Sequence, residues 1–298
     1  MGNAFEFAIQ STDNLWANAQ IDLAIEEIRR IERLLTTFSN DSITSIVNQN
    51  AGIEPVEVPQ EVFELIFRCQ KISELTQGAF DITYGGIDKS LWNFDLKMKT
   101  LPSAEVAAKS VRLIDYQKIV LDQMNRTVFL KEKGMRIGFG GIGKGYAADK
   151  ATELLKKSGV VSGFVNAAGD LNTWGVQENG KPWTIGVADP NQKKEIFSSL
   201  DITNAAIATS GNYEKYVTIG GKRYSHTIDP KTGLPVSGIK SVTIITQNAE
   251  LADALATPVM VMGIKVGLDL INQLKGVGCI VIDDNNKLFL SKNININQ

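Results

Sequence analysis

Hydrophobic residues recur at helical spacing in two segments of the first third of the chain. In the first segment, charged residues separate Ile21, Ile25, Ile28, Ile31, Leu35 and Phe38. This pattern predicts an amphipathic helix that begins near Asp13-Asn14 and ends at Phe38-Ser39-Asn40-Asp41. The second segment predicts a helix that begins at Pro59 and ends at Gly78, because proline is favoured at helix starts and glycine just after helix ends.

Shorter apolar runs predict strands, and turn residues pair several of them into hairpins. Residues 4–10 alternate between apolar and polar and predict the first strand. Gly220-Gly221 predicts the turn between strands at 216–219 and 223–228. We expect further strands at 119–121, 127–130, 160–165, 171–176, 183–187, 202–208, 241–245, 278–282 and 287–290. Further helices are expected from Ser103 to about Leu113, from about Lys144 to Gly159, over 249–262 and over 265–274.

The order of these elements predicts an α+β fold with mixed or antiparallel sheets, hairpins and packed helices. The strict β-α-β-α alternation of a parallel sheet is missing. No repeat and no linker-like segment divides the 298 residues. We therefore expect one domain over residues 1–298, although a chain of this length could also form two intimate lobes.

The composition is that of a globular protein, with 43% hydrophobic and 21% charged residues. The net charge of −2 argues against a nucleic-acid binder that is held by phosphate contacts. No apolar run approaches the length that spans a membrane. Cys69 and Cys279 both lie in apolar contexts, so buried and inert thiols are expected rather than a disulfide or metal framework.

A cluster of glycines at residues 138–145 precedes a predicted helix. Glycine lets the backbone approach a ligand closely, and a helix start offers free N–H groups to an anion. Gly138–Gly143 also fits G-x-G-x-x-G, and Gly138–Lys144 fits G-x-x-x-x-G-K. Neither match has the right context, because hairpins precede the cluster and Gly145 replaces the Ser or Thr that would hold magnesium. A tight glycine turn is the simpler alternative, but five glycines favour a phosphate-binding loop.

Two basic side chains are candidates for phosphate chemistry. Lys144 stands at a helix start, where the helix dipole disfavours a cation unless an anion lies opposite. Most lysines are merely solvated, and that alternative stays open. His226 is the single histidine of the chain and stands where a strand meets the turn Asp229–Gly233. A structural role and an acid–base role are about equally expected for it.

Asp253 and Thr257 are four residues apart in a predicted helix, so both side chains lie on one face. Two hard oxygen ligands suit Mg²⁺, which takes further ligands from water and phosphate. Pro258 would kink the helix there and free a carbonyl. The alternative is a polar stripe on a packed helix. Ser210, in a small polar turn at a strand end, is a weaker candidate for phosphate contact, and a plain turn is equally expected.

Taken in order, these segments resemble the ApbE family, the FAD:protein FMN transferases. Each piece alone is weak, but their joint order and spacing is specific and covers nearly the whole chain. The matching pieces are Met1-Gly2-Asn3, Thr36–Ser39 with Ser42, Gly78–Asp81, Gly140–Asp149, Asn166 with Gly169-Asp170, Thr209–Gly211, Ser225-His226 with Ile228–Pro230 and Thr232-Gly233, and Asp253–Thr257.

The resemblance implies a T-fold-related, two-lobe architecture and an enzyme that uses FAD with Mg²⁺. Such enzymes move the FMN half of FAD onto a Thr or Ser hydroxyl of a flavoprotein, form a phosphoester and release AMP. The acceptor would carry an Asp-x-x-Ser/Thr-x-Ala-Thr type motif. Some members instead hydrolyse FAD to FMN and AMP. An FAD pyrophosphatase and a non-catalytic FAD-binding protein are therefore the alternatives.

Carried over position by position, the resemblance implies a site from distant parts of the chain. The Asp253 carboxylate and Thr257 hydroxyl would bind Mg²⁺ together with the Gly141 carbonyl. Lys144 would meet the FAD pyrophosphate. His226 would lie near the reacting phosphate, where it would contact FAD and act as a general base on the incoming hydroxyl. The resemblance thus implies His226 and Asp253 as the catalytic residues. The residues implied along the flavin and adenosine pocket are Met1, Phe38, Ala79, Phe80 and Asp81.

Two features depart from the family pattern. Gly138 and Phe139 occupy the Asp-Leu positions of a D-L-G-G-I-A-K-G type run, so an FAD contact assigned to that aspartate is missing here. Family members are commonly exported, often as lipoproteins, yet no signal peptide is visible. By resemblance we expect the cell envelope or the periplasmic side, with the cytoplasm as the alternative.

Overall fold

The structure is a computed structural model that describes residues 4–87, 91, 100–188, 196–211 and 216–294. The chain forms two compact units, and each is assembled from segments that are far apart in the sequence. Unit 1 comprises Met1–Ile31, Ile142–Tyr213 and Ile239–Gln298, and unit 2 comprises Glu32–Gly141 and Glu214–Gly238. The expectation of one functional domain over residues 1–298 stays a prediction.

A seven-stranded sheet is the centre of unit 1. Every pair of neighbouring strands in it is antiparallel, which confirms the α+β prediction and rules out a doubly wound parallel sheet. In their order across the sheet, the strands are β1 (Phe5–Ile9), β5 (Gly163–Ala167), β6 (Asp170–Trp174), β9 (Ala206–Gly211), β12 (Ile239–Thr246), β13 (Gly278–Asp283) and β14 (Leu288–Leu290).

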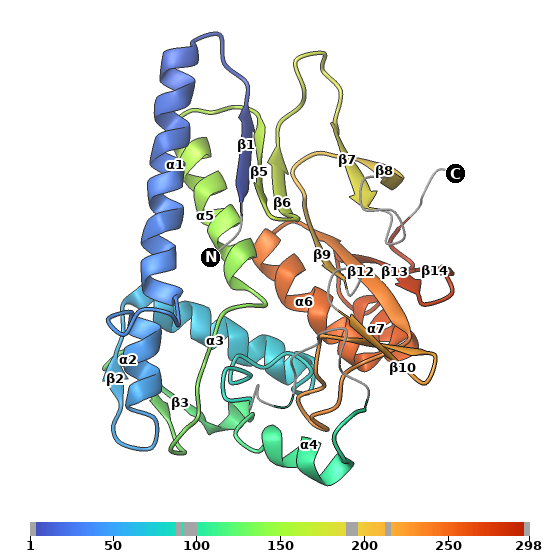
Figure 1. Ribbon diagram of the computed structural model, residues 1–298. Helices are drawn as coiled ribbons and strands as arrows, with labels where there is room; N and C mark the ends of the chain where they lie inside the picture. The colour runs from blue at the N-terminus through green and yellow to red at the C-terminus, as the bar shows by residue number, and fades with distance from the viewer. Residues whose placement is uncertain (1–3, 88–90, 92–99, 189–195, 212–215, 295–298) are drawn as a thin grey trace. The chain divides into compact units, whose positions relative to one another are not determined.

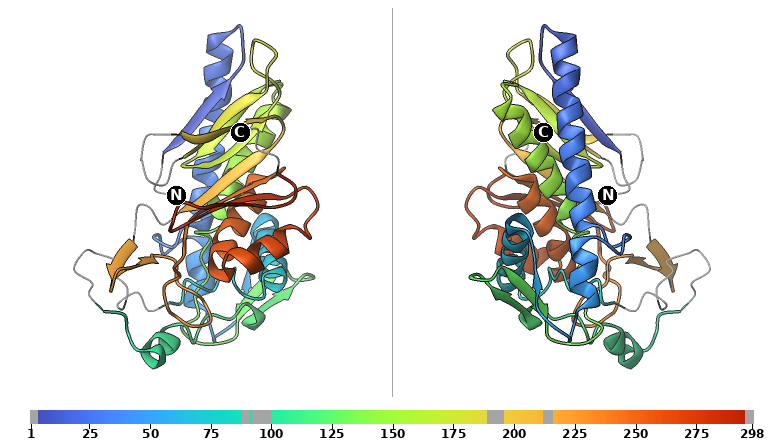
Figure 2. Two further views of the ribbon diagram at one scale, coloured as in Figure 1. Left: turned by 90° about the vertical axis from the view of Figure 1, so that its right-hand side faces the viewer. Right: turned by 90° about the vertical axis from the view of Figure 1, so that its left-hand side faces the viewer.

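Helices α5 (Gly143–Lys157) and α6 (Ala249–Met262) lie along one face of this sheet (Figures 1 and 2). Between them they pack on β5, β6, β9 and β12, and α7 (Ile264–Ile271) packs on α6 and β13. The two long helices approach very closely at Gly145, where an added Cβ atom would lie 2.1 Å from the Ala249 carbonyl oxygen. Glycine at this position therefore has a packing reason within the fold.

Unit 1 also contains a separate hairpin of β7 (Trp183–Ala188) and β8 (Ile196–Ile202). The Trp183 ring packs edge-on against Phe164 of β5 with their centroids 5.5 Å apart. Its indole N–H donates to the Trp174 carbonyl oxygen over 3.1 Å, which joins the start of the hairpin to the sheet. Helix α1 (Asn14–Leu35) follows β1, and its residues after Ile31 are counted with unit 2.

Unit 2 is built from short elements and long loops. A three-stranded antiparallel sheet has the order β2-β4-β3, and β10 and β11 form a hairpin. A small apolar cluster of Ile87, Ala107, Val111 and Ile228 joins its distant segments. The elements are α2 (Ile43–Gln49), β2 (Val56–Glu57), α3 (Gln60–Leu75), α4 (Ala104–Ser110), the 3₁₀ turn Tyr116–Lys118, β3 (Ile119–Asp122), β4 (Thr127–Leu130), β10 (Tyr216–Ile219) and β11 (Lys222–Ser225).

Local sequence signals account for most element boundaries. Ser103 caps α4, as predicted, because its hydroxyl accepts a hydrogen bond from the Val106 N–H at 3.3 Å. Gly220 and Gly221 have φ values of 60° and 77°, as a two-residue hairpin turn requires. Gly263, at 81°, separates α6 from α7 where the sequence predicted the break.

Some local predictions were wrong or incomplete. Helix α2 was not predicted, although Ser42 caps it and accepts from the Ser45 N–H at 3.0 Å. The strand expected over 202–208 is two strands, because Asn204 adopts a φ of 53° and breaks the extended chain between β8 and β9. Ser210 lies within β9, paired with Val242, and not in a turn.

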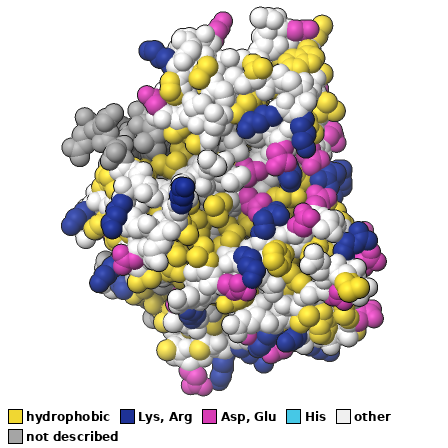
Figure 3. Space-filling model, turned by 180° about the vertical axis from the view of Figure 1, so that it is seen from behind, with side chains coloured by type: hydrophobic (Ala, Val, Ile, Leu, Met, Phe, Trp, Pro, Cys, Tyr) yellow, Lys and Arg dark blue, Asp and Glu magenta, His cyan; other side chains and the backbone are white. Residues whose placement is uncertain are grey.

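Side chains of both signs are interspersed on the face drawn in Figure 3. Basic and acidic groups alternate there over short distances, so this face presents no extended field of one sign. Among the described residues, no helix combines the length and the apolar character that crossing a bilayer needs.

Candidate active site

Helix α6 presents Asp253 and Thr257 one turn apart in unit 1, as their spacing predicted. The Asp253 side chain is buried, with only 7% of the residue exposed, and Thr257 is half-buried. The Thr257 hydroxyl lies 3.4 Å from the hydroxyl of Ser210 on β9. The structure therefore brings three predicted site residues of unit 1 together: Asp253, Thr257 and Ser210.

Lys144, in the first turn of α5, forms an ion pair with Asp170 at the start of β6. Asp170 is 2% exposed, and its carboxyl group also faces the carboxyl group of Asp253. The sequence predicted a phosphate opposite Lys144. Within the folded chain, a buried carboxylate already faces this lysine.

The pKa values of these three groups reflect burial and the charged groups that each one faces. Burial and the neighbouring Asp170 raise the pKa of Asp253 to about 8, while Lys144 and the Gly145 N–H oppose the shift. Burial also raises the pKa of Asp170, against the opposing effect of Lys144. Burial lowers the pKa of Lys144, but Asp253 and Asp170 outweigh it and the net direction is upward. The cluster thus holds one cation for two acids.

These residues fit a divalent cation that is held by few protein ligands. When both buried carboxyl groups are ionised, the single lysine leaves an excess of negative charge, which a metal ion would neutralise. Pro258 has no N–H, so the buried Ala254 carbonyl lacks its usual helical donor on the same helix. Within the described residues, no group of three or more His, Cys, Asp or Glu side chains is arranged for a metal. Sparse oxygen ligation of this kind suits Mg²⁺, which keeps waters and substrate oxygens.

The glycine loop before α5 belongs to unit 2 as far as Gly141. The buried side chain of Asn48 on α2 holds the start of this loop through two hydrogen bonds to the Ile137 backbone. Its Oδ1 accepts from the Ile137 N–H at 2.7 Å, and its Nδ2 donates to the Ile137 carbonyl oxygen at 3.0 Å. The Gly138 N–H donates to the Ile82 carbonyl oxygen over 2.8 Å. A Cβ atom added at Gly140 would meet nothing within 4 Å, and one at Gly141 only Phe80 at 3.8 Å. Neither the packing nor the φ angle explains glycine at these two positions, which supports close approach by a ligand.

The loop Ala79–Asp81 is fixed from both sides in unit 2. The Thr76 hydroxyl accepts from the Phe80 N–H at 3.0 Å, and Ala79 and Phe80 are buried. The Asp81 carboxylate accepts from the Thr83 N–H at 2.8 Å, the Thr83 hydroxyl at 2.6 Å and the Tyr116 N–H at 2.8 Å. Burial raises the pKa of Asp81, and these hydrogen bonds oppose the rise. The Asp81 carboxylate thus stabilises the conformation of the loop.

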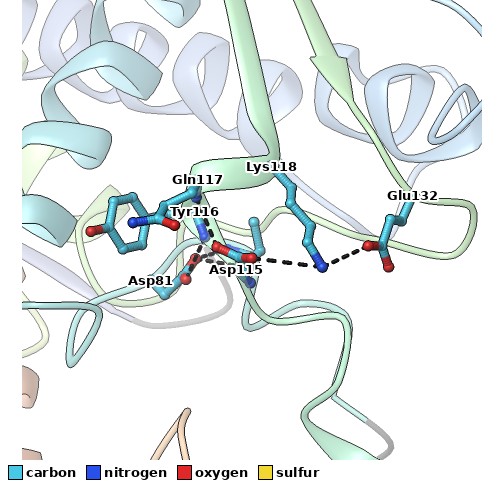
Figure 4. Close-up of polar contacts among 7 residues, drawn as sticks. Asp81, Asp115, Tyr116, Gln117, Lys118 and Glu132 are labelled. Atoms are coloured by element: carbon cyan, nitrogen blue, oxygen red, sulfur yellow. Dashed lines mark hydrogen bonds and ion pairs between the residues drawn. The ribbon is translucent and has the colours of Figure 1, made fainter.

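Asp81 also lines an open cavity of about 400 Å³ in unit 2, together with residues of α4, of the segment Ile114–Lys118 and of the turn at Pro230. Lys118 extends between Asp115, at 3.6 Å, and Glu132, at 2.6 Å (Figure 4). The Asp115 carboxylate in turn accepts from the Gln117 N–H at 3.0 Å. Lys118, Asp115 and Glu132 are therefore engaged with one another, whereas Asp81 accepts from the Tyr116 N–H (Figure 4).

His226 directly follows β11 in unit 2, and its side chain is exposed. Its neighbours are buried, and the Ser225 hydroxyl accepts from the Thr227 N–H at 3.0 Å. The predicted turn Asp229–Gly233 follows, with the Gly233 N–H donating to the Asp229 carbonyl oxygen over 2.9 Å. A rigid bend thus presents the histidine at the surface of its unit.

The remaining predicted residues do not join either group by a described contact. Phe38 was predicted as part of the first helix, but α1 ends at Leu35 and Phe38 is 100% exposed. Met1 lies outside the described residues. Gly141 and His226 belong to unit 2, whereas Asp253 and Thr257 belong to unit 1.

Known proteins resemble this chain over almost its full length. The family model described as the ApbE family matches residues 1–281. A protein of Klebsiella pneumoniae (strain 342) named FAD:protein FMN transferase is 30% identical over 98% of this chain and 89% of its own length.

The chain belongs to the ApbE family.

Two solved ApbE structures have the same fold. The ApbE protein of Thermotoga maritima MSB8 matches with a TM-score of 0.86 and 31% identity, over 98% of this chain and 94% of its own. The flavinyl transferase ApbE of Pseudomonas stutzeri, in its apo form, matches with a TM-score of 0.85 and 26% identity, over 98% and 92%. The resemblance that the motifs indicated is therefore confirmed at the level of family and fold.

The ApbE motifs also contain residues whose importance the sequence did not reveal. Asp170 and Asp149 stood within the matching segments but received no role. The signal for Asp170 was an acid directly after a tight turn, which the φ values of 52° at Ala168 and 102° at Gly169 now define. No periodicity could have shown that this acid lies against Asp253, because their contact joins a strand to a distant helix.

Proposed function

We propose that this ApbE-family chain is a Mg²⁺-dependent transferase that moves FMN from FAD onto a Thr or Ser hydroxyl of a target flavoprotein. The product is a phosphoester, and AMP is released. Family membership and the names of the relatives support flavin transfer. The observation that carries the metal dependence is the buried Asp170–Asp253 pair with a single lysine beside it.

In the proposed reaction, the acceptor oxygen attacks the phosphorus atom on the FMN side of the pyrophosphate. A new P–O bond forms to the acceptor, the P–O bond to AMP breaks, and AMP leaves with the electron pair. The hydroxyl proton passes to His226, because a Thr hydroxyl is too weak an acid to lose it unaided. The reaction needs alignment and charge neutralisation more than covalent help from the protein.

The chain's own residues divide these tasks. Asp253 and Thr257, together with the Gly141 carbonyl, would hold Mg²⁺, and Ser210 would contact the ligand beside Thr257. Lys144 would exchange its contact with Asp170 for one with the pyrophosphate. When bound, Mg²⁺ supplies positive charge to the oxygens on which negative charge develops. Gly140 and Gly141 leave room for the pyrophosphate to approach the backbone.

The flavin and adenosine parts of FAD would be held by residues of unit 2 and by Met1. Exposed Phe38 offers an aromatic face for stacking. The loop Ala79–Asp81 would contribute through its fixed shape, since the Asp81 carboxylate is engaged within the loop.

The test combines the protein, FAD and Mg²⁺ with a folded acceptor domain that carries an Asp-x-x-Ser/Thr-x-Ala-Thr motif. We expect mass spectrometry to find one FMN adduct on the acceptor Thr, with AMP released in equal amount. An acceptor with Val in place of that Thr, and a reaction with EDTA, should give no adduct. An adduct that is absent under all conditions rules out the transferase.

The same experiment separates the two alternatives. AMP and FMN that form without an adduct indicate an FAD pyrophosphatase, in which water takes the place of the hydroxyl. FAD that stays intact after prolonged incubation with Mg²⁺ indicates a non-catalytic FAD-binding protein. The glycine at position 138, where family members carry an acid, motivates this second control.

A further inference from the structure

Helix α6, which carries Asp253 and Thr257, begins without a cap of its own. Asn248 occupies the N-cap position, but its side chain makes no capping hydrogen bond. The first N–H groups of a helix have no partner within the helix and need an acceptor when they are buried. Ala249, the first residue of α6, is fully buried. The partner for its N–H must therefore come from elsewhere in the fold.

Asp149 of α5 supplies this cap from a neighbouring helix. Its Oδ1 accepts from the Ala249 N–H at 2.9 Å, and its Oδ2 accepts from the Glu250 N–H at 2.9 Å. The residue is 9% exposed. A carboxylate at a helix N-terminus also interacts favourably with the helix dipole. One side chain of α5 thus satisfies two successive N–H groups in the first turn of α6.

Two further contacts fix the direction in which α6 faces. Asn172 of β6 donates to Asp149 Oδ1 over 2.6 Å, which holds the carboxylate in place. One turn before Asp149, the Gly145 N–H donates to Asp253 Oδ2 over 3.2 Å. Gly145 and Asp149 are one turn apart on α5, and their partners Asp253 and Ala249 are one turn apart on α6.

We propose that Asp149 is a positioning residue. It fixes the rotation of α6 about its axis and its position along that axis, and thereby directs Asp253 and Thr257 toward the bound metal ion. The proposal rests on the proposed function, because it assigns these two side chains to Mg²⁺. Residues four apart lie on the same face of a helix, because a helix turns by roughly 100° per residue. A rotation of α6 about its axis would therefore move the oxygens of Asp253 and Thr257 together, away from a shared site. Outer contacts of this kind orient metal ligands.

The test measures metal binding directly, without turnover. Mn²⁺ replaces Mg²⁺ as the probe, and the free ion is counted by electron paramagnetic resonance in protein without FAD. The variant Asp149→Asn keeps the shape of the side chain but replaces one acceptor oxygen with a donor. Because the Ala249 and Glu250 N–H groups use different oxygens of Asp149, one of them then loses its acceptor. We expect Mn²⁺ affinity to fall by about 10-fold or more, as for other outer-shell partners of metal ligands.

A matched control is available at α1. Asp13 caps that helix with its Oδ1, which accepts from the Leu15 and Trp16 N–H groups at 3.0 Å each, and it is exposed. Asp13→Asn changes the charge of a capping aspartate in the same unit, and we expect Mn²⁺ affinity to stay within about 2-fold of wild type because asparagine caps equally well. If Asp149→Asn does not fold, Asn172→Ala tests the same network, with a smaller expected loss.

Each outcome decides between a positioning and a merely structural role. Weaker Mn²⁺ binding, with FAD binding in EDTA and circular dichroism unchanged, supports the proposal. Unchanged Mn²⁺ affinity in a folded Asp149→Asn overturns it and leaves the proposed function intact. An equal loss of Mn²⁺ and metal-free FAD binding also overturns it, because the damage is then general. A wild-type protein that binds no Mn²⁺ refutes the metal dependence in the proposed function, and the role of Asp149 with it.

Discussion

Asp81 in unit 2 and Asp253 in unit 1 are both buried aspartates, and they differ in what surrounds their oxygens. Asp81 accepts three hydrogen bonds from Thr83 and Tyr116. Asp253 accepts one from the Gly145 N–H and faces a second acid, Asp170. The first carboxylate is satisfied by the fold. The second is left with repulsion that the fold does not remove.

This difference supports the proposal that Asp253 is a functional acid and Asp81 a structural one. Burial and a neighbouring acid raise the pKa of both groups, but three hydrogen bonds oppose the rise for Asp81, whereas the pKa of Asp253 reaches about 8. A protein that needed only stability would replace such a pair with apolar side chains, because buried like charges cost free energy. Perturbed acids that face one another are typical of functional sites.

The largest effect should follow from Asp253→Ala. We expect Mg²⁺-dependent turnover to fall by at least about 100-fold, since metal-ion catalysis supplies several kcal/mol of charge stabilisation. Circular dichroism should stay unchanged. Asp269→Ala, which removes an exposed acid from α7, is the control with expected wild-type rates. Unchanged activity at limiting Mg²⁺ would remove Asp253 from the site.

His226→Ala tests whether unit 2 contributes a general base in addition to the loop Ala79–Asp81. We expect the transfer rate to fall by about 10²–10⁴-fold, the usual range for a lost general base. The FAD dissociation constant, measured by flavin fluorescence, should change much less. If both quantities fall equally, His226 is a binding residue and the reaction uses another base.

The comparison also predicts a pH dependence of stability in the metal-free protein. Because Asp253 has a higher pKa in the folded chain than its ordinary 3.8, the folded state binds more protons than the unfolded state between about pH 4 and about pH 8. Its contribution to the free energy of unfolding is therefore present at low pH and is lost as the pH rises through about 8. Denaturant titrations from pH 5 to 8.5 should show this fall, and Mg²⁺ should offset it at the upper end.

Two variants check the origin of this pH dependence. Asp253→Asn cannot ionise and should flatten the slope over this range. Asp81→Asn should change the slope less than Asp253→Asn, because the hydrogen bonds to Asp81 oppose the rise in its pKa. A slope that survives in Asp253→Asn would assign it to another group.

The smallest effect on chemistry should come from Asp81→Ala. We expect a loss of about 2–3 kcal/mol in the free energy of unfolding, since hydrogen bonds to charged groups contribute about 1.5–3 kcal/mol each and are not additive. Mn²⁺ affinity should match wild type at a temperature where the variant is folded. A loss of metal affinity without a loss of stability would contradict the structural role assigned here.

Much of the fold could be predicted because its signals are local. The apolar spacing of α3 and α6, the serine cap of α4 and the paired glycines between β10 and β11 act within one or two turns of chain. The misses were also local in cause. Helix α2 has only seven residues, and the positive φ of Asn204 breaks what looks in the sequence like one strand.

Part of the candidate site was predictable for the same reason. The spacing of Asp253 and Thr257 fixes their shared helix face, and the glycines before α5 fix an open loop. The partners of these residues were not predictable. The Gly145–Asp253 contact joins residues 108 positions apart, and Asp149 reaches Ala249 over 100 positions.

The sequence by itself thus determined most of the elements, the family and the face of α6 that carries the proposed oxygen ligands, because helical periodicity and turn chemistry act between near neighbours. Only the tertiary structure decided which groups meet these ligands. The packing of α5 and α6 on the antiparallel sheet brings Asp170 close to Asp253. It also places Asp149 at the N-terminus of α6. Burial and charge then change the pKa values of residues that are far apart in the sequence. No local sequence pattern predicts such long-range contacts.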